Sequence, residues 1–184
     1  MLRQPPKTHQ LGITLVEFMT TVGIVSVLAG VAAPNFAAWQ ASTRIRASAD
    51  IIHAGLRLAR SEAVVRNTNV VFTLQPDGSW NVGCETVTTN CPATLHTRPG
   101  AEIRGDISLA VTQLNAESAS GASSVLFNSR GTPDSAPASL RTVDITAPSV
   151  MPSAPGRQLR VTLSAFGQTR LCDPNAGVGS PTSC

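Results

Sequence analysis

The stretch HQLGITLVEFM, residues 9–19, places a carboxylate at the fifth position of an apolar run that follows a short basic leader. The run covers residues 13–33 and is interrupted only by Glu17 and by small or hydroxylated residues. About 20 apolar residues are enough for a helix to cross a bilayer. A charge inside such a segment costs on the order of 2.5–3.5 kcal/mol on insertion scales. The stretch therefore predicts an N-terminal membrane helix in which Glu17 has a function.

A secretory signal peptide is the first alternative for this segment, because the small residues LAGVAA at 28–33 resemble a cleavage site. The apolar core of a signal peptide is roughly 7–15 residues long. The run here is longer, and Glu17 lies where a signal core is most apolar. Both features favour the membrane helix.

The same residues resemble the type IV prepilins and the pseudopilins of type II secretion, which carry a basic leader ending in Gly, an apolar residue, three more residues and Glu. Here that pattern is Gly12 followed by ITLVE and a long apolar helix, and Pro34 lies where such pilins carry a bending proline. Ile13 departs from the usual Phe. The resemblance implies cleavage between Gly12 and Ile13 by a prepilin peptidase and methylation of the new amino terminus. It also implies that Glu17 pairs with the amino group of a neighbouring subunit during assembly, which offsets the burial of both charges.

The helix is expected to continue beyond the membrane and to end near NTN at 67–69. Apolar side chains recur there at spacings of three and four, which is typical of one buried face of an amphipathic helix. A helix over residues 13–66 would be about 80 Å long, and Pro34 should bend it. The positions of the buried face are Ile45, Ala49, Ile52, Leu56, Ala59 and Ala63.

Beyond residue 69 the apolar pattern alternates, which is typical of β-strands. The turn PDGS at 76–79 predicts a hairpin between residues 69–75 and a return strand that begins at Trp80. Alternation over residues 158–166 places Leu159, Val161, Leu163 and Ala165 on one face and Arg160 on the other. We expect a mainly antiparallel sheet packed on the helix. Its other strands are predicted at residues 102–111, 124–129, 139–146 and 169–172.

Several segments resemble the GspH/FimT branch of minor pilins and pseudopilins. They are LRLARSEAVVRN at 56–67, the PDGSW hairpin, VLFNSRGTP at 125–133 and FGQTRLC at 166–172. The resemblance covers nearly the whole chain and implies the α+β type IV pilin fold. It divides the chain into a leader (1–12), a transmembrane half-helix (13–33), an amphipathic half-helix (34–67) and a β-rich periplasmic head (68–184).

The four cysteines form two local pairs, with neither C-x-x-C spacing nor a histidine at metal-ligand distance in sequence. Next to a membrane-targeting start, this pattern favours disulfides in an oxidising compartment over metal binding. Four cysteines allow three pairings, and proximity in sequence favours Cys84–Cys91 and Cys172–Cys184.

Binding of DNA is a further hypothesis, since some FimT-like minor pilins take up DNA through a C-terminal Gly-Arg-x-Arg motif. The matching positions here are 167–170, where glutamine replaces the first arginine. Arg157 and Arg160 would lie near Arg170 if the last strands pair, and a few guanidinium–phosphate contacts give weak, salt-sensitive binding. The alternative is that all three are ordinary solvated arginines.

No nucleophile elbow, phosphate loop or metal-ligand spacing is present, so we expect neither an enzyme nor a cofactor, metal or small-molecule substrate. The resemblance implies a minor pilin of a type IV pilus, and the alternatives are a type II secretion pseudopilin or a DNA receptor for transformation. The expected partners are other pilins, the prepilin peptidase and, for the DNA receptor, DNA. The expected location is the bacterial inner membrane, spanned once with a periplasmic head, before assembly into a pilus or pseudopilus.

Overall fold

A computed structural model of the chain describes residues 12, 14–100, 107–113, 123–136, 138–147, 158–177 and 179–184, without the side chains of residues 32–35, 37 and 38. The chain forms two compact units, Met1–Ala37 and Ala38–Cys184. We call the second unit the head. Both units contribute to the one helix of the described residues, α1 (Leu15–Arg66).

The long helix ends where the sequence predicts it. α1 stops at Arg66, and Asn67 takes a left-handed backbone conformation with φ of 52°. The N–H of Thr68 then donates to the carbonyl of Ala63 at 3.2 Å, and the N–H of Asn67 donates to that of Val64 at 3.3 Å. This pair of bonds satisfies carbonyls that the helix leaves free at its end. The bend predicted at Pro34 stays a prediction.

The predicted apolar face of α1 is confirmed, because all six of its residues are at most 2% exposed. Next to this face lies Gly55, where the helix meets two aromatic rings. A Cβ added there would lie 2.8 Å from the ring of Phe72 and 3.0 Å from that of Trp80. Glycine at this position therefore allows the helix to approach the strands closely.

The first sheet contains the predicted hairpin. It has the strand order β3-β2-β1-β5, and all its pairings are antiparallel. The turn between β1 and β2 uses Gly78 at φ of 82°. The strand β3 was not predicted, since it has three residues and no buried side chain to mark it. The four strands are β1 (Val70–Leu74), β2 (Trp80–Cys84), β3 (His96–Arg98) and β5 (Ser123–Phe127).

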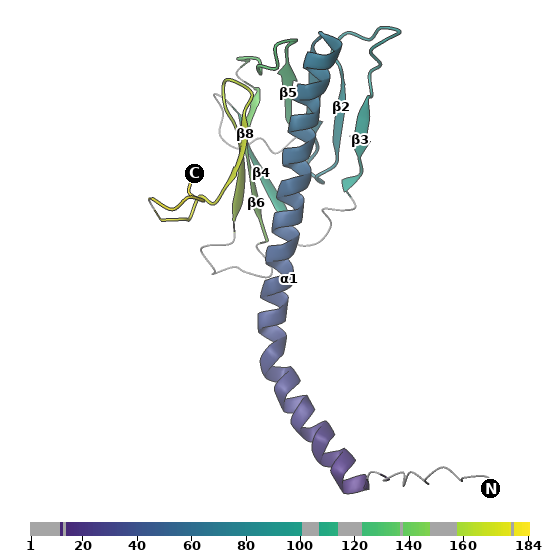
Figure 1. The fold of residues 1–184 in the computed structure, drawn as a ribbon, viewed down its shortest axis with the longest axis vertical. Helices are drawn as coiled ribbons and strands as arrows, with labels where there is room; N and C mark the ends of the chain where they lie inside the picture. Colours follow the sequence, from purple (N-terminus) through teal and green to yellow (C-terminus); the bar gives the residue numbers. More distant parts are fainter. Residues whose placement is uncertain are drawn as a thin grey trace, which may run out of the picture. The chain divides into compact units, whose positions relative to one another are not determined.

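The second sheet has the order β4-β6-β7-β8 and is also antiparallel. Figure 1 labels its strands β4, β6 and β8. The sequence predicted one sheet, whereas the described residues form two, which the isolated parallel bridge Ser124↔Ser139 connects. Residues 102–106 of the first predicted strand lie outside the described residues. The strands are β4 (Ser108–Gln113), β6 (Leu140–Thr146), β7 (Leu159–Leu163) and β8 (Thr169–Cys172).

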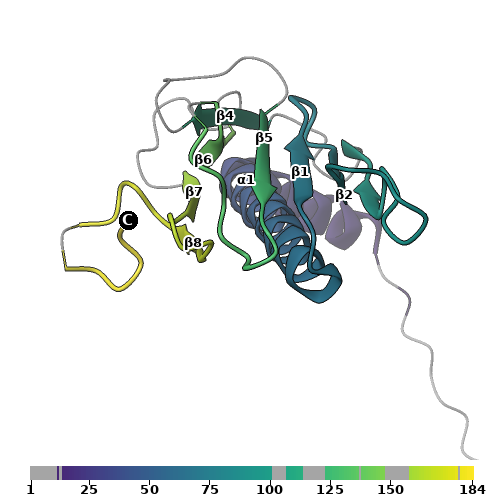
Figure 2. The same cartoon turned by 90° about the horizontal axis from the view of Figure 1, so that it is seen from above.

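Both sheets contribute to one core with the second part of α1, and Figure 2 shows their strands arranged around one side of that helix. Val161 and Leu163 of β7 point into the core as predicted, but Ala165 is exposed because the strand ends at Leu163 and the chain turns. Among the described residues, the cluster of buried apolar side chains runs from Ala41 to Leu163, within the second unit. The head therefore has a hydrophobic core of its own.

Candidate functional site

The first turn of α1 contains the carboxylate on which the sequence analysis depends. Glu17 is exposed, and its backbone N–H donates to Oγ1 of Thr14 at 3.3 Å. Thr14 thus caps the helix, and a carboxylate in the first turn is favoured by the helix dipole. The Thr-x-x-Glu spacing of a capping box is the sequence signal for a helix start here, and it was not among the signals used above. Gly12 is exposed, and Ile13 lies outside the described residues, so the processing site stays a prediction.

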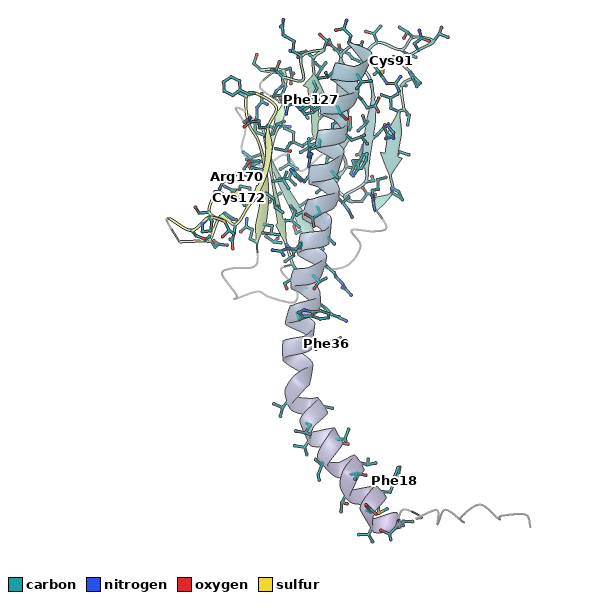
Figure 3. All side chains as sticks on the ribbon, viewed as in Figure 1. Phe18, Phe36, Cys91, Phe127, Arg170 and Cys172 are labelled. Carbon is teal, nitrogen blue, oxygen red and sulfur yellow. A yellow bond between two sulfur atoms is a disulfide. The ribbon has the colours of Figure 1, made fainter. Side chains whose placement is uncertain are left out.

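The first part of α1 exposes an extensive apolar surface, on which Phe18 is labelled in Figure 3. Surfaces of this kind mark contact with a membrane or with another protein. Within the described residues, no helical stretch is both long enough and apolar enough to cross a membrane, and the anchor at 13–33 stays a prediction. The large exposed side chains are Leu15, Val16, Phe18, Met19, Val22, Ile24, Val25, Val27, Leu28 and Val31.

The arginines considered for DNA binding are engaged within the chain where the structure describes them. Arg160 forms a two-pronged ion pair with Asp144, with Nε–Oδ1 and Nη2–Oδ2 distances of 2.6 and 2.8 Å. The hydrogen bond with Asp144 raises the pKa of Arg160, and the carboxylate of Asp144 neutralises the positive charge of this guanidinium. Arg170 donates from Nη2 to the carbonyl of Ser183 at 2.8 Å. Figure 3 labels Arg170 on β8, and Arg157 lies outside the described residues. DNA binding stays a prediction.

Three segments that carry the resemblance to the GspH/FimT branch meet at Arg60. Its Nε donates to the carbonyl of Gly131 at 3.0 Å. Gly131 and Gly167 have φ of 74° and 76°, and a Cβ added at Gly167 would clash with the carbonyl oxygen of Gly131. The turn in NSRGTP (128–133) and the turn in FGQ (166–168) therefore both pack against Arg60, the arginine of LARSE (58–62). Arg60 and Gly131 lie 71 positions apart, so this contact is not evident from the sequence.

A polar cluster fixes the C-terminal end of α1. Nε of Arg66 lies 2.7 Å from Glu62, Nε2 of His96 lies 3.2 Å from the same carboxylate, and Nη1 of Arg66 donates to the carbonyl of Asn90 at 2.8 Å. The hydrogen bond from Arg66 lowers the pKa of Glu62, an effect that His96 adds to and partial burial opposes. His96 and Glu62 lie 34 positions apart, so their proximity in the head is not evident from the sequence.

Two disulfide bonds, Cys84–Cys91 and Cys172–Cys184, join cysteines whose Cα atoms are 5.7 and 5.1 Å apart. They are the pairs that proximity in sequence favoured. The first closes the loop after β2, to which Arg66 is bonded through Asn90. The described residues contain no group of three or more His, Cys, Asp or Glu side chains that could hold a metal ion.

The comparisons with known proteins agree with this architecture. The family model of type II transport protein GspH matches residues 48–167. The type IV minor pilin FimU of Pseudomonas aeruginosa is 19% identical, with a TM-score of 0.51 over 77% of this chain and 96% of that chain. The minor pseudopilin EpsH from the type 2 secretion system of Vibrio cholerae is 16% identical, with a TM-score of 0.51 over 72% and 99%. Both show that the fold is that of the type IV pilins. The search of curated proteins found no match.

Proposed function

The chain belongs to the family of type II transport protein GspH, and from this membership we propose that it is a minor pilin, a structural subunit of a type IV pilus rather than an enzyme. The observation that carries the proposal is the family match over residues 48–167, which include the second part of α1 and seven of the eight named strands. The fold likeness to FimU supports a pilus subunit. The equal likeness to EpsH supports the alternative, a type II secretion pseudopilin.

Processing at the N-terminus is the first step of the proposed function. A prepilin peptidase cleaves between Gly12 and Ile13, and the new amino group is methylated. In the sequence, Ile13 directly precedes Thr14, which caps α1, and the helix dipole disfavours a positive charge near that start of the helix. Glu17, in the first turn, supplies the opposite charge, first near its own amino terminus and then to the amino group of a neighbouring subunit. Because this carboxylate is exposed, an incoming subunit can reach it.

The exposed apolar side chains of Leu15–Val31 support an anchor in the inner membrane before assembly. The head then lies in the periplasm, where its two disulfides can form and persist. During assembly the same apolar side chains move from lipid into the interior of the filament, so that they stay out of water in both locations.

Two experiments test the proposal. Deletion of the gene is expected to reduce surface pili while secreted enzymes still leave the cell, and the reverse result would assign the chain to secretion. Mass spectrometry of the membrane-extracted protein is expected to find methylated Ile13 at the N-terminus. The Glu17→Val variant is expected to have the same methylated N-terminus, but to be absent from filaments sheared off the cells. An unprocessed chain that still enters filaments would contradict the proposal.

A further inference from the structure

The surface of α1 is hollowed near the turn between β7 and β8. Two depressions of about 320 and 360 Å³ adjoin there, and Arg57 and Arg60 line both of them. The first also contains His53, and the second also contains Val64 and Val65. We call the combined feature the α1 groove. It has a basic half and an apolar half, and both belong to the head.

The basic half is held in place by the fold. Arg60 is fixed by its bond to Gly131, and Nε2 of His53 lies 3.4 Å from the carbonyl of Thr169. Arg57, in contrast, is exposed on the helix surface. None of the described residues that line the groove is acidic. A carboxylate entering this half would therefore meet two guanidinium groups, with which it can form paired hydrogen bonds.

The apolar half stays in contact with water although it lies on a well-packed helix. Val65 is 82% exposed and Val64 is 49% exposed. Covering these side chains would remove apolar surface from water, which is the main favourable contribution to most protein–protein association.

We propose that the α1 groove binds a segment of a different filament subunit, in which a carboxylate is followed closely by an apolar side chain. This inference rests on the proposed function. The carboxylate would lie between Arg57 and Arg60, and the apolar side chain would cover Val64 and Val65. The apolar half offers nothing to the phosphates of a nucleic acid, whose binding depends on basic side chains.

A second copy of this chain fits the groove less well than a different subunit does. In the described part of the head, an exposed acid close to a large exposed apolar residue is Glu85, two positions before Val87. Glu17, beside the exposed Phe18, lies outside the head and is proposed above to pair with the amino group of a neighbouring subunit. The carboxylate of Glu85 already accepts a hydrogen bond from Nδ2 of Asn69 at 2.8 Å. Docking of that loop would break this bond.

The test is photo-crosslinking with benzoylphenylalanine at Val65 of the full chain, in cells that assemble the filament. The expected product links Val65 to a different pilin subunit, close to an Asp or Glu of that subunit. Arg57→Glu is expected to lower the yield at least about tenfold, because it places two carboxylates together. Arg44→Glu, at an exposed position of α1 outside the groove, is the matched control and should leave the yield unchanged. An Arg in place of the mapped acid should restore the yield in the Arg57→Glu background.

The remaining outcomes would overturn the proposal. One is a crosslink from Val65 to nucleic acid, to lipid or to residues 85–87 of a second copy, and another is the absence of any crosslink. The third is an equal loss of crosslinking yield in Arg57→Glu and Arg44→Glu, when urea unfolding shows that both heads are folded. The same probe at Val22, on the exposed apolar part of α1, separates the two levels of inference. Links from Val22 without links from Val65 would remove the groove and leave the proposed function. Links from neither position would remove both.

Discussion

Arg60 of α1 and Gly131 of the turn after β5 are joined by a hydrogen bond of 3.0 Å, although 71 positions separate them in sequence. Gly167 packs against the same carbonyl from the turn between β7 and β8. One helix side chain thus holds two turns that follow strands of different sheets. This explains in physical terms why the LARSE, NSRGTP and FGQ segments occur together in one chain.

Replacing Arg60 by Ala should destabilise the head by about 1–2 kcal/mol, because the carbonyl of Gly131 loses its donor and the turns lose the alkyl chain beneath them. Arg57→Ala is the matched control, three residues earlier and exposed, and should change stability by no more than about 0.5 kcal/mol. Urea unfolding of the isolated head, which has its own core, measures both. Equal losses in the two variants would show that the bond to Gly131 contributes nothing.

Gly55→Ala should destabilise the head by about 1–3 kcal/mol, since the added methyl group would overlap the rings of Phe72 and Trp80. Helix propensity alone predicts the opposite sign, because Ala favours a helix by about 1 kcal/mol over Gly. Gly177→Ala, where a Cβ meets nothing within 4 Å, is the control and should be close to neutral. Thermal unfolding followed by circular dichroism measures the difference. A stabilised Gly55→Ala head would show that the helix and the sheet can separate at little cost.

The pair Asp144–Arg160 should show a coupling energy of about 1–3 kcal/mol in a double-mutant cycle with Ala, because the side chain of Asp144 is only 12% exposed and both of its carboxylate oxygens are hydrogen-bonded. The pair Glu62–Arg66, at the surface of α1, offers an internal comparison and should give about 0.3–0.5 kcal/mol. Urea unfolding of the four heads in each cycle gives both values. A coupling near zero for Asp144–Arg160 would mean that Arg160 is free to meet an external anion.

Glu62 should make the stability of the head depend on pH in the acid range. Its pKa in the folded head lies below the ordinary 4.5, so the folded state binds fewer protons there than the unfolded state. Above pH 4.5, the free energy of unfolding of the wild-type head should therefore exceed that of Glu62→Gln by less than about 1 kcal/mol. This difference should disappear as the pH falls through the lowered pKa of Glu62. Unfolding curves between pH 3 and pH 7 check the sign. An advantage that grows on acidification would contradict this assignment.

Periodicity in the sequence was sufficient for most of the elements. The buried positions of α1 from Ile45 to Ala63 follow from a spacing near 3.6, and the β1–β2 hairpin follows from a glycine turn between alternating runs. These signals are local, since each depends on residues within one or two turns of the chain. The division into two sheets is not local. It depends on pairings between distant residues, such as Ser124 with Ser139, that no spacing reveals.

The candidate site was predictable only in part, for the same reason. Alternation in β7 placed Arg160 on the face opposite Val161, but its solvation depends on Asp144, which lies opposite it in the register of β6. Likewise, Arg57 and Arg60 are ordinary exposed positions until the turn at Gly167 forms the other wall of the groove. The Thr14 cap, in contrast, was visible in sequence as Thr-x-x-Glu.

The buried face of α1 also determines how the head would carry a mechanical load. A pull along the helix axis would act on the contacts from Ala41 to Ala63 in shear, so that they would have to give way together instead of opening one after another. The close approach of the rings of Phe72 and Trp80 to Gly55 adds resistance to sliding, because a neighbouring residue with a side chain would meet these rings if the helix moved along its axis. Forced unfolding is governed by the rate of crossing such a barrier rather than by equilibrium stability. The head is therefore built to hold its helix under tension along the helix axis.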